Sequence, residues 1–137
     1  MSQFNSIPLI TTNIIFGNGV GSDIYSFNSS NFTRFPSLKR IEIGNQCFQH
    51  VREFVVDGLE SLESVKIGER CFKKGEGERD DGISRITNCS NLRQLEIGDR
   101  SFEDFKSFEL SNLNSLQSIE FGNNCFKYAE EFLLKGE

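Results

Sequence analysis

The chain has 137 residues, a net charge of -5 and a hydrophobic content of 36%, enough for one domain with its own core. The negative charge argues against nucleic-acid binding, which selects basic patches. No run approaches the roughly 18 apolar residues of a membrane span. The 14 phenylalanines recur at regular positions, which argues against a disordered chain.

The N-terminal segment, residues 1–34, differs in composition from the rest, and Asp23 is the only charged residue before its last position. We interpret this segment as an N-terminal cap or a degenerate repeat, because terminal repeats are usually atypical. Within it, residues 14–16 followed by Gly17 resemble a strand and its turn. The apolar start has no preceding Lys or Arg and is a poor secretory signal. If Met1 is the true start, we expect a cytoplasmic protein.

From residue 35 onward, a short segment recurs in four copies. The copies span residues 37–48, 61–72, 91–102 and 115–126, and each reads Leu-x-x-apolar-x-apolar-Gly-x-x-Cys/Ser-Phe. Their glycines are spaced by 24, 30 and 24 residues. A fixed period of this size is typical of repeat architectures. The sequence therefore predicts a solenoid.

Each repeat contains two short stretches of alternating apolar residues. In the first copy, Leu38, Ile41 and Ile43 point inward, and the period of two predicts a strand. The glycine that follows predicts either a turn with positive φ or a tight bend. Phe48 then returns to the core and stacks on its equivalents in neighbouring repeats. Residues 54–56 alternate again and predict a second strand on the opposite side.

These features predict an α/β-class solenoid that is mostly β, a leucine-rich-repeat array of about four rungs with parallel sheets on two sides and little or no helix. The predicted rungs are residues 35–58, 59–89, 90–112 and 113–137. The second rung is six residues longer than the others, within the charged, glycine-rich stretch 73–82. Insertions in repeat proteins often lie on a binding face, and the alternative is a tolerated, solvated bulge. The candidate loop residues are Lys73, Lys74, Glu76, Glu78, Arg79, Asp80 and Asp81.

The last rung ends at Glu137 without the pattern of a polar cap. We expect an open edge there, which favours pairing with another chain. Either the sequence is a fragment of a longer protein, or association through this edge covers it.

The repeated segment resembles the leucine-rich repeat. The family's segment Leu-x-x-Leu-x-Leu-x-x-Asn-x-Leu is matched, with phenylalanine last, by Leu62, Val65, Ile67, Arg70 and Phe72. The small residue before the phenylalanine resembles the BspA-like type, whose units run about 22–24 residues. The resemblance covers residues 35–137 and implies an exposed sheet that binds other proteins. Only Asn124 occupies the family's asparagine position, so the family's buried asparagine ladder is not predicted here.

The residues that could carry chemistry are few. Cys47, Cys71 and Cys125 hold the same place in their rungs, and Cys89 replaces an inward leucine. Buried free cysteines behave as small hydrophobes, so we interpret all four as reduced core residues, which fits the cytoplasm. No Cys-x-x-Cys pair exists and His50 is the only histidine. We therefore predict no metal site, no cofactor and no enzyme activity.

The outward residues of the predicted first sheet stack into columns and are the candidate partner-binding residues. They are Lys39, Arg40, Glu42, Glu63, Ser64, Lys66, Arg93, Gln94, Glu96, Gln117, Ser118 and Glu120. Opposite charges alternate along two columns, and such exposed pairs contribute only about 0.2–1 kcal/mol each. A solvated, self-neutralising sheet is therefore one interpretation. The other is a non-enzymatic leucine-rich-repeat binding module or scaffold for a protein partner. Further alternatives are a cell-surface adhesin or glycan-binding repeat array, and a fragment of a longer structural scaffold.

Overall fold

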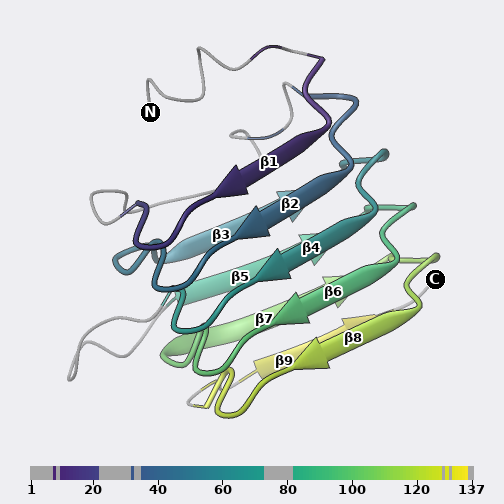
Figure 1. The fold of residues 1–137 in the computed structure, drawn as a ribbon. Coiled ribbons are helices and arrows are strands. Elements are labelled where there is room, and N and C mark those ends of the chain that lie inside the picture. The colour runs from purple at the N-terminus through teal and green to yellow at the C-terminus, as the bar shows by residue number, and fades with distance from the viewer. Residues whose placement is uncertain are drawn as a thin grey trace.

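In the computed structural model, the described residues (8, 10–21, 32, 35–72, 82–127, 129 and 131–135) wind into a parallel β-solenoid of about four turns. Within them the chain forms nine strands and no helix (Figure 1). Every strand pairing is parallel. The predicted mostly-β solenoid with sheets on two sides is therefore confirmed.

Consecutive strands alternate between two sheets. The first sheet has, in order, β1 (Asn13–Phe16), β2 (Arg40–Ile43), β4 (Ser64–Ile67), β6 (Gln94–Ile97) and β8 (Ser118–Phe121). The second sheet has β3 (Glu53–Asp57), β5 (Gly82–Thr87), β7 (Phe105–Ser111) and β9 (Glu131–Lys135). The weak strand signal near the N-terminus is β1, which pairs with β2 and buries Ile14. The division of the chain at residue 34 stays a prediction.

The register confirms the alignment of the second rung across its insertion. Phe54 of β3 opposes Ser84 of β5, and Ser84 in turn opposes Phe108 of β7. The inserted stretch 73–81 lies outside the described residues. The same holds for the candidate loop residues Lys73, Lys74, Glu76, Glu78, Arg79, Asp80 and Asp81.

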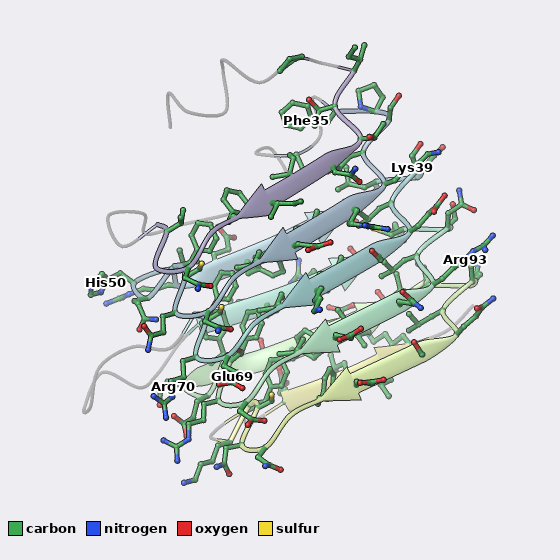
Figure 2. All side chains as sticks on the ribbon, in the orientation of Figure 1. Phe35, Lys39, His50, Glu69, Arg70 and Arg93 are labelled. Atoms are coloured by element: carbon green, nitrogen blue, oxygen red, sulfur yellow. The ribbon has the colours of Figure 1, made fainter. Side chains whose placement is uncertain are left out.

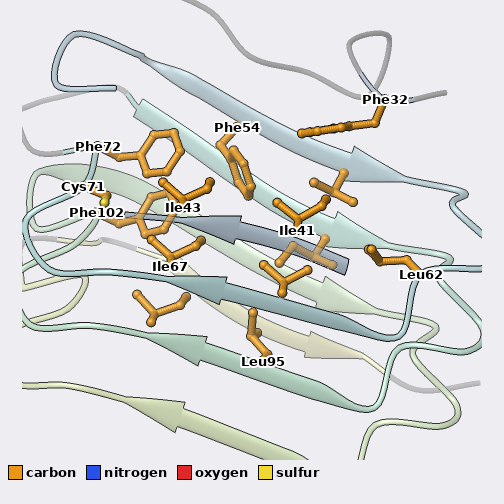
Figure 3. Packing of buried hydrophobic residues seen from close by; sticks show 14 of the residues in the cluster. Phe32, Ile41, Ile43, Phe54, Leu62, Ile67, Cys71, Phe72, Leu95 and Phe102 are labelled. Atoms are coloured by element: carbon orange, nitrogen blue, oxygen red, sulfur yellow. The ribbon is translucent and has the colours of Figure 1, made fainter. Parts of the chain in front are cut away.

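A continuous column of phenylalanine rings fills the core between the sheets. It comprises Phe48, Phe72, Phe102 and Phe126, with successive ring centroids 5.5, 4.5 and 5.2 Å apart and ring planes within 19° of parallel. Figure 3 shows Phe72 and Phe102 beside the inward side chains of the first sheet. Offset stacking of this kind adds to the free energy gained from burial alone. The predicted stacking of equivalent phenylalanines is confirmed.

The second rung has Ser84 where the others have an aromatic, and the next rung adds a buried ring that the sequence-based prediction does not include. Phe105 begins β7 opposite Gly82, where the register between β5 and β7 shifts. An added Cβ on Gly82 would lie 2.8 Å from the Phe105 ring. That ring is fully buried and meets Phe102 edge-on, with centroids 5.0 Å apart. Gly82, directly after the insertion, thus leaves room for the Phe105 ring of the next rung.

The repeated glycine, at Gly44, Gly68, Gly98 and Gly122, does not adopt a positive φ. Positive φ occurs two residues later, at Gln46, Arg70, Arg100 and Asn124, and again at the phenylalanines. The glycine is instead required because the preceding rung lies too close for a side chain. At Gly98, an added Cβ would lie 2.7 Å from the carbonyl carbon and oxygen of Gly68. Of the two expectations for this residue, positive φ is therefore wrong.

Candidate partner-binding surface

The outward side chains of the first sheet form three columns, which together we call the outer face. The first column is Lys39, Glu63, Arg93 and Gln117; the second is Arg40, Ser64, Gln94 and Ser118; the third is Glu42, Lys66, Glu96 and Glu120. Residues of the second and third columns are direct register partners within the strands. Those of the first column precede the strands and are joined through the backbone. The N–H of Arg93, for example, donates to the carbonyl of Glu63 at 2.9 Å. The structure thus brings together every predicted residue of this face.

Most of the outer face is open to solvent. Glu42, Ser64 and Glu96 are half-buried, and the other members of the three columns are exposed. One ion pair crosses between columns, from Arg40 Nη1 to Glu42 Oε2 at 3.6 Å. Because both side chains are substantially exposed, this pair contributes little to stability. The charges of the face are therefore mostly left to interact with solvent or with a partner.

Charge is unevenly distributed between the columns. The first two columns carry three cations and one anion, namely Lys39, Arg40, Arg93 and Glu63. The third column carries three anions and one cation, namely Glu42, Glu96, Glu120 and Lys66. The outer face is therefore positive where its strands begin and negative farther along them. Figure 2 shows Lys39 and Arg93 at the edge where the strands begin, with Glu69 and Arg70 at the opposite edge.

The positive side of the outer face is hollowed into a groove of about 460 Å³. It is lined by Thr12 and Asn13 at the start of β1 and by members of the first and second columns, including Lys39, Glu63 and Arg93. Pockets for small molecules are usually lined mostly by apolar and aromatic side chains. A groove lined by charged and amide side chains, running across several rungs, instead matches the polar surface of a macromolecule.

The β1 segment adds residues to this surface that the sequence-based prediction does not include. Asn13 opposes Arg40, and Ile15 opposes Glu42 at the head of the third column. Ile15 is 66% exposed and places an apolar side chain beside the charged columns. The alternation in which Ile14 points inward and Ile15 outward is the signal that could have identified it.

A ladder of side-chain hydrogen bonds joins the rungs at the turn edge. In each of its four bonds, a thiol or hydroxyl donates to the carbonyl of the repeated glycine in the preceding rung. The bonds are Cys47 Sγ to Gly17 O at 3.0 Å, Cys71 Sγ to Gly44 O at 2.9 Å, Ser101 Oγ to Gly68 O at 2.7 Å and Cys125 Sγ to Gly98 O at 3.0 Å. The thiols are free, as predicted. The interpretation of Cys47, Cys71 and Cys125 as simple hydrophobes is incomplete, since each donates to the glycine carbonyl of the preceding rung. The serine at position 101, a polar substitute for cysteine, is the sequence signal for this role.

Burial keeps Cys71, Cys89 and Cys125 protonated. It raises the pKa of Cys71 from an ordinary value of 9.0 to about 12, and it also raises the pKa values of Cys89 and Cys125. A thiol acts as a nucleophile or a metal ligand only as the thiolate. These side chains are therefore hydrogen-bond donors of the scaffold at neutral pH.

Within the described part of the chain, no group of three or more His, Cys, Asp or Glu residues could hold a metal ion. No helix there is long and apolar enough to cross a membrane. Comparisons of the chain with protein-family models, curated proteins and solved structures find no match.

Proposed function

We propose that this protein is a non-enzymatic binding module of the leucine-rich-repeat type, which holds a protein partner on its outer face. The observation that carries the proposal is the polar groove of about 460 Å³ on a face whose charge changes sign along the strands. The proposal involves no catalytic step and no cofactor. It places the protein in the cytoplasm and gives it no nucleic-acid partner.

The scaffold holds the charges of this face in fixed relative positions. Parallel strands lie about 4.8 Å apart, so the columns present one side chain per rung at that interval. Among the described residues, the side chains of Lys39, Glu63 and Arg93 make no hydrogen bond or ion pair. A partner does not have to break internal contacts to reach them.

The charge distribution specifies the complementary chemistry. A partner surface that places acidic groups over the groove and a basic group over the third column matches both signs. Charge complementarity of this kind mainly sets the orientation of the partner and the association rate, which falls as salt concentration rises. The outer-face columns contain no Trp or Tyr, the residues that dominate tight interfaces. Ile15, which is 66% exposed, offers a partner an apolar contact beside the charged columns.

The test is affinity capture from the native cell with wild-type protein, Arg93→Glu and a matched control, Lys106→Glu. Lys106 is an exposed cation on β7 of the second sheet, so the control makes the same change in charge away from the groove. We expect a protein that wild type and Lys106→Glu retain and Arg93→Glu loses. Equal retention by all three forms would overturn the proposal. Capture of a glycan instead of a protein would favour the adhesin alternative.

A further inference from the structure

The first and third columns of the outer face carry opposite charges in three successive rungs. In each of these rungs the two charged residues stand three positions apart in the sequence, and the order of the signs is reversed in the middle rung. The pairs are Lys39 with Glu42, Glu63 with Lys66, and Arg93 with Glu96. In the next rung, the amide of Gln117 stands three positions before Glu120. The two columns are therefore complementary to each other, rung by rung.

Within one chain these complementary charges do not meet. Three residues of a strand span about 10 Å, which separates each charge of the first column from its counterpart in the third. Among the described residues of the outer face, the one ion pair joins Arg40 to Glu42 across 3.6 Å. Glu63, Lys66 and Arg93 make none. The complementarity of the two columns is thus unused within the chain.

A second copy placed against the outer face uses this complementarity. If two copies meet about a two-fold axis parallel to the stack of rungs, their strands point in opposite directions and each rung stays opposite the same rung. The first column of each copy then faces the third column of the other, so that Glu63 of one copy lies opposite Lys66 of the second copy. Facing sheets lie about 10 Å apart, a gap that a lysine and a glutamate side chain bridge together. The two copies of Arg40 approach each other near the axis, and the Glu42 carboxylate beside each one offsets their repulsion.

The columns also select this register over its neighbours. A shift by one rung places Lys39 opposite Lys66 and Glu63 opposite Glu96 of the second copy, and like charges opposite one another are destabilising. A two-fold axis parallel to the strands instead turns the mostly acidic third column against itself. The reversal of signs in the middle rung, which both columns share, therefore favours one arrangement of the two copies.

We propose that the protein held on the outer face is a second copy of this chain, bound face to face about a two-fold axis parallel to the stack of rungs. The inference rests on the proposed function, because it names the occupant of the same surface. The mostly acidic third column of each copy covers the polar groove of the other. Thr12, which holds the first-column place beside β1, lies over the exposed side chain of Ile15 of the second copy.

The size of the face determines how strong this dimer is. Five strands of four residues each, spaced by about 4.8 Å, project to roughly 300 Å². Each partner of a standard interface buries about 800 Å². Contacts between exposed charges are also screened by salt. The dimer is therefore weak and reversible, and it forms best at low ionic strength.

The test is sedimentation equilibrium of the full chain at about 10 µM to 1 mM protein, in about 50 mM and about 500 mM salt. We expect a monomer of 15.6 kDa in equilibrium with a dimer, and a dissociation constant that rises with salt. Glu63→Lys and Lys66→Glu each place like charges opposite one another twice, which weakens the dimer by about ten-fold. Lys106→Glu, the matched control on β7 of the second sheet, leaves the dimer unchanged.

A mixture of the two single variants gives the sharpest result. In a mixed dimer, the introduced lysine of Glu63→Lys faces the introduced glutamate of Lys66→Glu, and the remaining natural residues of the two copies also face each other with opposite charge. We expect the mixture to associate with about wild-type affinity, although each variant alone binds itself about ten-fold more weakly. The double variant Glu63→Lys/Lys66→Glu regains self-association for the same reason. Circular dichroism checks that every variant remains folded.

A chain that stays monomeric at every concentration in low salt overturns the dimer. Single variants that dimerise like wild type, or a mixture that associates no better than its components, overturn it as well. Affinity capture with Arg93→Glu separates this inference from the proposed function. A monomeric chain that retains a different protein, which Arg93→Glu loses, overturns the dimer and supports the binding module. A monomeric chain that retains no protein overturns both.

Discussion

The close approach of successive rungs at the turn predicts a sharp difference between two chemically identical substitutions. Gly98 and Gly17 hold the same place in their rungs, directly after a strand of the first sheet. An alanine Cβ at Gly98 would lie 2.7 Å from the carbonyl carbon and oxygen of Gly68 and 2.9 Å from the amide nitrogen of Glu69. An alanine Cβ at Gly17 meets no described atom within 4 Å.

The loss of stability expected for Gly98→Ala follows from the backbone atoms that the new Cβ would displace. Ordinary carbon contacts begin near 3.4 Å, so the two turns must separate by about 0.7 Å, and backbone atoms cannot swing aside as a side chain can. That separation lengthens the hydrogen bond from Gly98 N–H to Ile67 O, now 2.8 Å, and the one from Ser101 Oγ to Gly68 O, now 2.7 Å. Overpacking costs about 1–3 kcal/mol, and each weakened hydrogen bond adds up to about 1 kcal/mol. Reduced freedom of the unfolded chain returns about 0.4–1 kcal/mol, so we expect a net loss of about 2–3 kcal/mol.

Urea denaturation of wild type, Gly98→Ala and Gly17→Ala measures these free energies of unfolding. We expect the midpoint of Gly98→Ala to fall by about 1–2 M and that of Gly17→Ala to stay within about 0.5 M of wild type or to rise. If the two alanine variants unfold at the same midpoint, the steric explanation of the glycine column is incorrect. Equal slopes across the three proteins are needed for the comparison.

Two further predictions concern the interior. Phe102→Ala removes a fully buried ring stacked between Phe72 and Phe126 and should lower the free energy of unfolding by about 3–5 kcal/mol; a loss below about 1 kcal/mol in urea denaturation would contradict the stacked column. Burial raises the pKa of Cys71 to about 12, so between pH 9 and 12 the unfolded chain releases a proton that the folded chain keeps. Stability therefore falls as pH rises through this window, by about 1.4 kcal/mol per pH unit for this thiol. Cys71→Ser keeps a donor but does not titrate, so its stability should fall less steeply between pH 9 and 10.5, and equal slopes would refute the assignment.

The sequence predicts those features of the scaffold that depend only on the residues of one rung and on their repetition. Strict alternation around Ile41 and Ile43 and the fixed period of the glycines predict the strands and their register. Phe54 and Ser84 align despite the insertion because apolar alternation resumes after it. These features depend on local sequence and on repetition, both of which are visible in the chain.

The roles that depend on the neighbouring rung are not predictable in this way. Glycine suggests positive φ, yet the group that excludes a side chain at Gly98 belongs to Gly68, thirty residues earlier. A cysteine in the sequence can be either an apolar core residue or a hydrogen-bond donor. Only the structure, in which Cys71 Sγ lies 2.9 Å from the Gly44 carbonyl oxygen, shows that it is a donor. The positions equivalent to Phe105 hold Val51 and Ala129, whose N–H groups also donate to the carbonyl of the phenylalanine three residues earlier, so repetition predicts an apolar residue there but not an aromatic one.

The candidate surface is also predictable only in part from the sequence. Its columns follow from register, so the sequence identifies their members and their alternating charges. The groove also requires Thr12 and Asn13 at the start of β1. This segment lacks the leucine of the repeat, so the sequence does not identify these residues or the neighbouring Ile15 as part of the surface. The depth of the groove depends on how the side chains of several rungs lie together, which no single rung encodes.

The glycine and thiol columns act together and leave the outer face free to vary. The Gly68 carbonyl, for example, both excludes a side chain at Gly98 and accepts the hydroxyl of Ser101. Because Gly98 has no side chain, its turn can lie against the turn of the preceding rung. Ser101, three residues later, then donates a hydrogen bond to the Gly68 carbonyl of that turn. Because the turn edge sets the spacing between rungs, the outward positions carry little of the folding free energy. This separation explains how Lys39, Glu63 and Arg93 can differ while the turn repeats. It also means that charge reversal at Arg93 should change binding without unfolding the solenoid.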